Sequence, residues 1–161
     1  MASIWRALGS IVDPEIPVVS IVELGIVRDV ARADDEWIIK LTPTYSGCPA
    51  IRTIEADVRA AVAGVTDAPL HLVTALSPPW STDWIAPEAR RKLAEAGIAP
   101  PGFAGGRAND EQTITFRRAE VRCPKCGSLR TQELSRFGST ACKAQYRCLD
   151  CLEPFDYFKP H

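Results

Sequence analysis

The chain has 161 residues, of which 46% are hydrophobic, and its formal net charge is −1 at pH 7. This composition predicts a folded protein and excludes a disordered one. The near-neutral charge gives little long-range attraction to polyanions, so we expect no nucleic-acid partner. No apolar run approaches the ~20 residues that a membrane-spanning helix needs, and no secretory leader pattern opens the chain. We therefore expect a cytoplasmic protein with no membrane partner.

Charge and composition divide the chain into two parts. Residues 1–110 carry 10 Lys and Arg against 14 Asp and Glu, whereas residues 111–161 carry 9 against 6. The stretch from 98 to 110 is rich in Gly, Pro and Ala, which is typical of a connection between domains. We predict a first domain over residues 1–100, a linker over residues 101–110 and a second domain over residues 111–161.

The first part begins with a helical pattern. Apolar residues recur at three- and four-residue spacing up to position 12, and residues 13–17, which contain two prolines, stop the helix in a rigid turn. A short second helix is predicted to end at Gly25, because glycine often follows the last turn of a helix. The residues expected on the buried face of the first helix are Ile4, Leu8, Ile11 and Val12.

Strand patterns follow. The β-branched, apolar runs at 26–32 and 36–41 are separated by three residues and predict a β-hairpin. Cys48 and Pro49 then open a long helix, and Pro49 suits the first helical position because its missing N–H is not needed there. The residues expected on the buried side of this helix are Ile51, Ile54, Val58, Ala61 and Val62.

The remaining elements are shorter. Residues 70–74 predict a third strand, and residues 87–96 predict a helix that Gly97 stops. Residues 113–116 and the stretches around the later cysteines predict short strands of a β-ribbon. The predicted fold class is therefore α+β, with a small α/β sandwich domain, a short mixed sheet with helices, followed by a β zinc ribbon.

Four cysteines in two Cys-x-x-Cys hooks predict a metal site. Cys123 and Cys126 form the first hook, and Cys148 and Cys151 form the second, with 21 residues between the hooks. Two intervening residues let both sulfurs of a hook reach one ion, and two hooks complete a tetrahedral thiolate shell. Zinc in a structural role is the expected ion, although iron shares this geometry. Cys142 lies outside the hooks, so we expect it not to be a ligand.

Cys48 stands apart from the hooks, where a loop becomes a helix. Backbone N–H groups and the positive end of the helix dipole favour a thiolate there, which makes Cys48 a candidate functional thiol. The alternative is a small buried capping residue. Asp13, Glu15 and Glu23 are candidate ligands or acids beside it, and the alternative for them is a capping or surface role.

Several motifs are absent from the sequence. There is no Glu-x-x-His pair for a di-iron centre and no glycine-rich nucleotide-binding loop. His71 is the one histidine apart from the last residue, which leaves little choice of base for a catalytic triad. We therefore expect no intrinsic catalysis. Trp80 and Trp84 share one loop and are candidates either for core anchors or for docking a partner.

The segments at 13–17, 21–27 and 41–49 resemble the iron–sulfur assembly family that contains SufT. The resemblance covers roughly residues 1–100. It implies a SufT-like domain in which Cys48 is the functional cysteine and the acidic turn lies beside it. It also implies a protein that helps to deliver or install iron–sulfur clusters.

The segments at 123–128, 135–144 and 153–159 resemble the PaaD family, also called PaaJ, whose members are associated with the phenylacetyl-CoA epoxidase of phenylacetate degradation. The resemblance implies a non-catalytic accessory factor that assists iron–sulfur cluster or iron-centre assembly in an epoxidase component. The implied partner is the reductase or the di-iron oxygenase. The implied cofactors are structural zinc and a transient iron–sulfur cluster.

One extension of this hypothesis and two alternatives to it remain open. A homodimer would let two copies of Cys48 share a cluster, because one chain offers few ligands. A rubredoxin-like electron carrier would hold iron between the hooks. A nucleic-acid-binding zinc ribbon draws support from the positive balance of residues 111–161, although that balance is modest for such a role.

Overall fold

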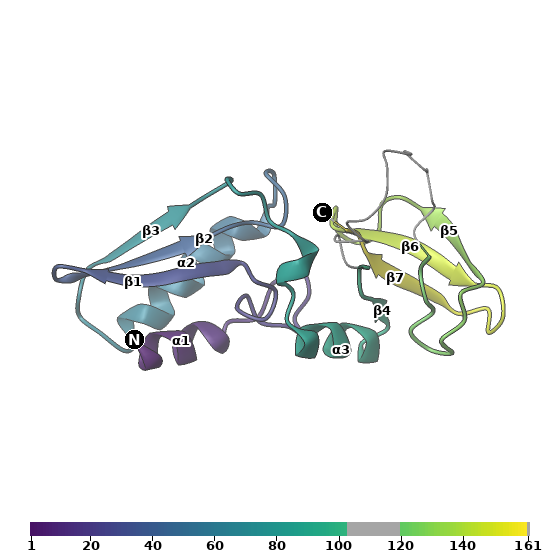
Figure 1. Ribbon diagram of the computed structural model, residues 1–161, viewed down its shortest axis with the longest axis horizontal. Coiled ribbons are helices and arrows are strands. Elements are labelled where there is room, and N and C mark those ends of the chain that lie inside the picture. Colours follow the sequence, from purple (N-terminus) through teal and green to yellow (C-terminus); the bar gives the residue numbers. More distant parts are fainter. Residues whose placement is uncertain (103–119, 161) are drawn as a thin grey trace, which may run out of the picture. The chain divides into compact units, whose positions relative to one another are not determined.

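The computed structural model describes residues 1–102 and 120–160. The chain divides into two compact units, Met1–Trp80 with Trp84–Lys92, and Ser81–Asp83 with Leu93–His161. The first unit contains a three-stranded sheet with helices, and the second contains a four-stranded sheet (Figure 1). This mixture confirms the predicted α+β class. The strand expected at 113–116 lies outside the described residues.

The first sheet has the strand order β1-β2-β3, formed by Val27–Ala33, Glu36–Leu41 and Leu70–Thr74. The predicted hairpin is confirmed, since β1 and β2 are antiparallel and Asp34 takes a φ of 50° in their tight connection. β3 runs parallel to β2. Parallel neighbours need a crossover, and the helix α2, Ala50–Ala63, supplies it.

Two helices cover one face of this sheet, α1 (Ala2–Gly9) and α2 (Figure 1). Alternate residues of β2 are buried, as expected for a strand with one covered face. Val12, expected on the buried face of the first helix, is 47% exposed, because α1 ends at Gly9 and Val12 instead pairs with Ser20 in an isolated β-bridge. The fully buried core of the unit includes Ile4, Leu8, Ile21, Leu24, Ile26, Ile39, Leu41, Ile54 and Val58.

The short helix predicted before Gly25 is one helical turn only. The N–H of Leu24 donates to the carbonyl oxygen of Ser20 at 2.9 Å, but the chain enters β1 directly afterwards. Ser20 and Glu23 form a capping box, in which each side chain accepts the other residue's N–H, at 3.1 and 2.8 Å. The predicted stop at Gly25 is confirmed by its φ of 71°.

The third helix, α3, spans Pro87–Glu95, and Gly97 follows it with a φ of 78°, as predicted. The tryptophans of the preceding loop both make contacts within the first unit. Trp80 is 4% exposed and its Nε1 donates to the carbonyl oxygen of Leu24 at 3.0 Å. The Arg28 guanidinium lies 3.5 Å from the centre of the Trp84 ring. Among the described helices, none has both the length and the apolarity to cross a membrane.

The second sheet has the order β4-β7-β6-β5, formed by Ile98–Ala99, Pro154–Phe158, Lys143–Cys148 and Thr131–Ser135. β4 pairs in parallel with β7, although it falls in the stretch whose composition resembles a connection. Its two residues are too few to show a strand pattern in the sequence. The small core beneath this sheet contains Ala99, Val121, Cys123, Ala144, Cys148, Phe155 and Tyr157.

Candidate metal centre and candidate thiol site

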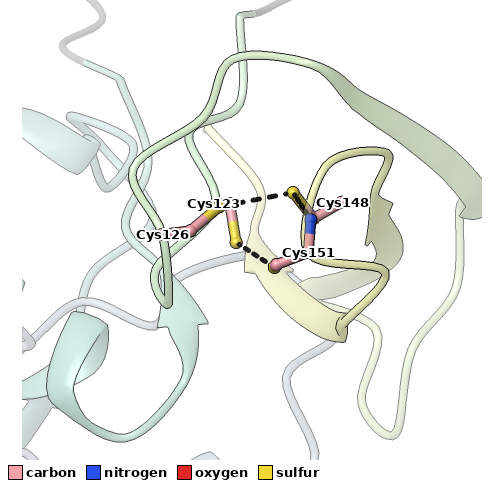
Figure 2. A group of neighbouring side chains, drawn as sticks. All are labelled: Cys123, Cys126, Cys148 and Cys151. Carbon is pink, nitrogen blue, oxygen red and sulfur yellow. Dashed lines mark hydrogen bonds between the residues drawn. The ribbon is translucent and has the colours of Figure 1, made fainter.

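The four hook cysteines converge on one point (Figure 2). Their sulfurs all lie within 4.8 Å of one another, with Sγ–Sγ distances of 3.7 Å between Cys123 and Cys151 and 3.5 Å between Cys126 and Cys148. A zinc ion with Zn–S bonds of about 2.3 Å places tetrahedral sulfurs about 3.8 Å apart. The donor type and its spacing therefore fit a tetrahedral thiolate metal site.

The two hooks have the same backbone conformation. In each, the N–H of the first cysteine donates to the carbonyl oxygen five residues later, at 2.9 Å. The fourth residue after that cysteine is left-handed in both hooks, with φ of 76° at Gly127 and 62° at Leu152. The glycine is an ordinary choice for this position, but nothing in the sequence signals the left-handed leucine. The repeated turn directs both sulfurs of each hook to the same point.

Hydrogen bonds polarise the thiols. The N–H of Cys151 lies 3.5 Å from Cys148 Sγ. This N–H, the N–H of Asp150 and the thiols of Cys126 and Cys151 together outweigh desolvation and lower the pKa of Cys148 to about 6. The N–H of Ser128 acts to lower the pKa of Cys126. The hydrogen bond with Cys148 and desolvation outweigh it and raise that pKa to about 12. A tetrahedral metal site needs the thiolate form of all four cysteines, so metal binding releases the protons that the other thiols still hold.

Cys142 does not join this group. Its side chain is buried, at 3% exposure, and its Sγ lies 3.1 Å from the Thr140 hydroxyl oxygen. The group of side chains placed to hold one ion consists of the four hook cysteines alone among the described residues. Cys142 therefore packs in the ribbon without a place in the metal shell.

Cys48 is half-buried and precedes α2. Burial raises the pKa of the Cys48 thiol, and the charges of Glu15 and Asp13 raise it further, although the Ala50 N–H opposes them. The sequence correctly predicts a helix N–H at the sulfur. The predicted preference for a thiolate is wrong, because desolvation and two neighbouring carboxylates outweigh that hydrogen bond.

The acidic turn reaches the neighbourhood of this thiol. Asp13 is 6% exposed, and its Oδ1 accepts the N–H groups of Glu15 and Ile16, both at 2.9 Å. These bonds fix the turn. The turn thereby holds two carboxylates whose charges act on Cys48.

Glu23 has a different environment. Its carboxylate accepts the Ser20 N–H and lies 2.6 Å from Lys92 Nζ. Burial acts to raise the pKa of Glu23, but the hydrogen bonds from Lys92 and Ser20 outweigh it and lower that pKa. The carboxylate therefore acts as a cap and an ion-pair partner, which is the alternative that the sequence left open.

Thr44 is a further member of the thiol site that sequence reasoning missed. It is 8% exposed, and its hydrogen bond with Cys48 partly offsets the rise in the pKa of that thiol. Its place in the segment at 41–49 that carries the family resemblance was the available signal. The site therefore places a buried hydroxyl beside the sulfur.

Comparison with known proteins matches both parts of the chain. Residues 1–68 match the model of an iron–sulfur cluster assembly protein, and residues 107–159 match the PaaD zinc beta ribbon domain. The chain is 48% identical, over 97% of its length and 90% of the relative, to a putative 1,2-phenylacetyl-CoA epoxidase subunit of Escherichia coli (strain K12). The chain belongs to the PaaD family. The resemblance found in the sequence is confirmed.

The first unit of this PaaD-family chain also matches smaller proteins. It is 38% identical to an Fe-S protein maturation auxiliary factor of Bacillus subtilis (strain 168), over 56% of the chain and 90% of that protein. A crystal structure of a domain of unknown function from Bacillus anthracis is 31% identical, with a TM-score of 0.51, over 57% of the chain and 89% of that structure. A conserved hypothetical protein from Thermotoga maritima is 26% identical, with a TM-score of 0.50, over 57% of the chain and 91% of that structure. These matches support the α+β fold of the first unit.

Proposed function

We propose that this PaaD-family protein is a non-catalytic accessory factor of a phenylacetyl-CoA epoxidase, which assists assembly of an iron–sulfur cluster or iron centre in one epoxidase component. The component is the reductase or the di-iron oxygenase. The name of the Escherichia coli relative supports the link to a phenylacetyl-CoA epoxidase. The name of the Bacillus subtilis relative supports a role in the maturation of iron–sulfur proteins. This one chain matches both an iron–sulfur cluster assembly domain and a PaaD zinc ribbon domain.

The observation that carries the proposal is the half-buried Cys48 beside the acidic turn and the Thr44 hydroxyl. A sulfur ligand with at most carboxylate neighbours holds iron weakly, which suits a protein that must release its cargo. Because the pKa of Cys48 is raised, binding of iron by its thiolate must release a proton. Iron uptake by this site should therefore strengthen as the pH rises. In this proposal Asp13 positions the turn, and Glu23 contributes through the capping box.

Anaerobic reconstitution tests the role of Cys48. Wild type, Cys48→Ala and Cys142→Ala are incubated with iron and sulfide, desalted, and assayed for iron, sulfide, zinc and visible absorption. We expect Cys48→Ala to lose most of the bound cluster while its zinc content is unchanged. Cys142→Ala is the matched control, since it removes a thiol that lies outside both sites. Equal cluster loading in wild type and Cys48→Ala would remove Cys48 from the mechanism.

The same reconstitution tests the homodimer. A cluster shared by two copies of Cys48 gives one cluster for every two chains and a dimer in sedimentation only when the cluster is present. One cluster for each monomer rejects the shared site.

The client is identified by producing each epoxidase component with and without this protein. Iron occupancy and activity of the dependent component should fall in its absence and recover when wild type is added, but not when Cys48→Ala is added. Unchanged occupancy of every component contradicts the proposal.

A rubredoxin-like electron carrier is the second candidate, because the sulfur geometry that fits zinc also fits iron. Visible absorption distinguishes the two. A ferric tetrathiolate site absorbs visible light, and this absorption should be lost in Cys148→Ser. A zinc site is colourless.

A further inference from the structure

A loop of the ribbon holds an aromatic side chain in solvent. Phe137, which lies just after β5, is 71% exposed, the highest value among the large hydrophobic residues that the structure describes. An exposed aromatic ring leaves a large apolar area in water, and aromatic residues dominate the binding energy of protein interfaces. A ring in this position is therefore a candidate binding residue.

The loop that carries Phe137 is fixed by its own hydrogen bonds. The Ser135 hydroxyl donates to the Phe137 carbonyl oxygen at 2.9 Å and accepts the Phe137 N–H at 3.1 Å. The next residue, Gly138, donates to the Lys143 carbonyl oxygen at 2.9 Å and packs so closely that a Cβ there would lie 3.2 Å from Lys143 Cβ. A loop ordered before binding loses less conformational entropy when a partner arrives.

A lysine lies against the same ring. Lys159 Nζ is 5.3 Å from the centre of the Phe137 ring. Elsewhere in the described part of the ribbon, Lys125, Arg130 and Lys143 form ion pairs with carboxylates at 2.6, 2.6 and 3.7 Å. The structure pairs Lys159 with no carboxylate of the described residues. A carboxylate from another molecule would complete this arrangement.

Arg136, the residue before Phe137, is a second cation of this loop, and its pairing with a carboxylate is weak. The Lys159 ammonium donates to the Arg136 carbonyl oxygen at 3.2 Å, which places the two cationic residues together. The Arg136 side chain is 86% exposed, and its contact with Glu133 is long, at 3.9 Å. An ion pair this long and this exposed contributes little free energy, so Arg136 remains able to bind a further anion.

A cavity of about 390 Å³ adjoins these groups. Aromatic rings and an alanine provide apolar lining, and the two cationic residues belong to the same lining. The cavity is therefore suited to an apolar side chain with a carboxylate beside it. Its lining residues are Glu133, Arg136, Phe137, Ala144, Tyr146, Tyr157, Lys159 and Pro160.

We propose that this surface, formed by Phe137, Arg136, Lys159 and the adjoining cavity, binds an acidic segment of a partner protein. An apolar side chain of the segment packs against Phe137 and enters the cavity, and a neighbouring carboxylate pairs with Lys159 and Arg136. The charged residues that line the cavity are two cations, Arg136 and Lys159, and one carboxylate, Glu133, which favours this anionic occupant. The surface does not involve Cys48, so its role stands independently of cluster handling.

Fluorescence anisotropy with the zinc-loaded full-length chain tests the proposal. The probe is a fluorescein-labelled peptide, Gly-Asp-Glu-Phe-Asp-Glu-Gly, and we expect saturable binding that weakens with added salt. Phe137→Ala and Lys159→Gln should each weaken binding about tenfold, a typical loss for a central interface residue. The matched controls are Leu129→Ala, which removes an apolar residue of 49% exposure outside the cavity lining, and Arg147→Gln, which removes an exposed cation. Both should bind within about twofold of wild type. Circular dichroism and zinc content verify folding.

Several results would overturn this surface. They are the absence of saturable binding, equal affinity for a peptide with Asn and Gln in place of its acids, and unchanged affinity in Phe137→Ala. Displacement of the probe by a single-stranded oligonucleotide at lower concentration than by unlabelled peptide would assign the surface to nucleic acid instead. Cys48→Ala should bind the probe as wild type does, and a loss there would contradict the independence of the two sites.

Discussion

The two units of the molecule use cysteine in opposite ways. In the ribbon, Cys123 and Cys148 are 1% and 0% exposed and belong to a core that is otherwise small. In the first unit, a larger core of aliphatic residues forms without sulfur, and Cys48 lies half-buried outside it. Thiols therefore belong to the core of the ribbon, whereas the first unit folds around hydrocarbon side chains and leaves its thiol outside the core, where we propose that it handles iron.

The largest expected effect is loss of the ribbon's metal. Structural zinc contributes ~10–16 kcal/mol to folding in small domains, so chelation or Cys148→Ser should unfold the ribbon. The first unit should remain folded, because its core contains no ligand. Two-dimensional NMR of the full chain checks this, through collapse of the ribbon's amide dispersion while signals of the first unit persist.

The control for this experiment is Cys142→Ser, which removes a buried thiol outside the metal shell. It should retain one zinc for each chain and a folded ribbon. Loss of zinc in Cys142→Ser, or cooperative unfolding of both units in Cys148→Ser, would contradict this division of roles between the units.

The second prediction reverses the comparison by damaging the first unit alone. Gly25 has a φ of 71°, and a Cβ there would lie 2.8 Å from both Cβ and O of Trp84. Gly25→Ala should therefore destabilise the first unit by about 2–4 kcal/mol through backbone strain and overpacking. Thermal denaturation should show an earlier transition with unchanged zinc content. Gly9→Ala is the control, since nothing lies within 4 Å of its added Cβ.

The smallest effect concerns pH. Hydrogen bonds from Lys92 and Ser20 hold the pKa of Glu23 below its usual 4.5, against the opposing effect of burial. A lowered folded-state pKa stabilises the protein above pH 4.5, and that contribution disappears as the pH falls through the lowered value. Glu23→Gln should cost about 1 kcal/mol at pH 7, after allowance for solvent screening, and nothing in strong acid.

Denaturant titrations of wild type and Glu23→Gln at several pH values check the Glu23 prediction. Glu36→Gln, which changes an exposed carboxylate at the start of β2, is the control. A constant difference between wild type and Glu23→Gln across the acid range would show that the ion pair and capping box do not titrate in this way.

Local patterns were sufficient to predict most elements of the first unit. The hairpin, α2, β3 and α3 follow from apolar periodicity and from glycines at turns, because one face of each element is buried. The turn before Gly25 has the same glycine signal, but the chain enters the first strand of the sheet after one turn. Periodicity cannot show where tertiary packing ends an element.

The sites divide in the same way. Spacing alone indicated that four cysteines meet, since two residues between thiols impose the geometry. The direction of the pKa shift at Cys48 was not predictable, because it depends on desolvation and on carboxylates from a turn more than 30 residues away in sequence. Thr44 is close to Cys48 in sequence, but its residue type does not show that its hydroxyl turns toward the sulfur. The left-handed backbone of Leu152 was also not predictable, because leucine rarely adopts this conformation.

The short strand β4 has a practical consequence for anyone who wishes to produce the ribbon by itself. The matched domain model starts at residue 107, yet Ala99, at 1% exposure, belongs to the ribbon's core and pairs with Tyr157. An expression fragment that starts at 107 would lack one edge of the sheet and leave that part of β7 uncovered. A fragment that starts at Leu93, where the second unit resumes, preserves this edge of the sheet.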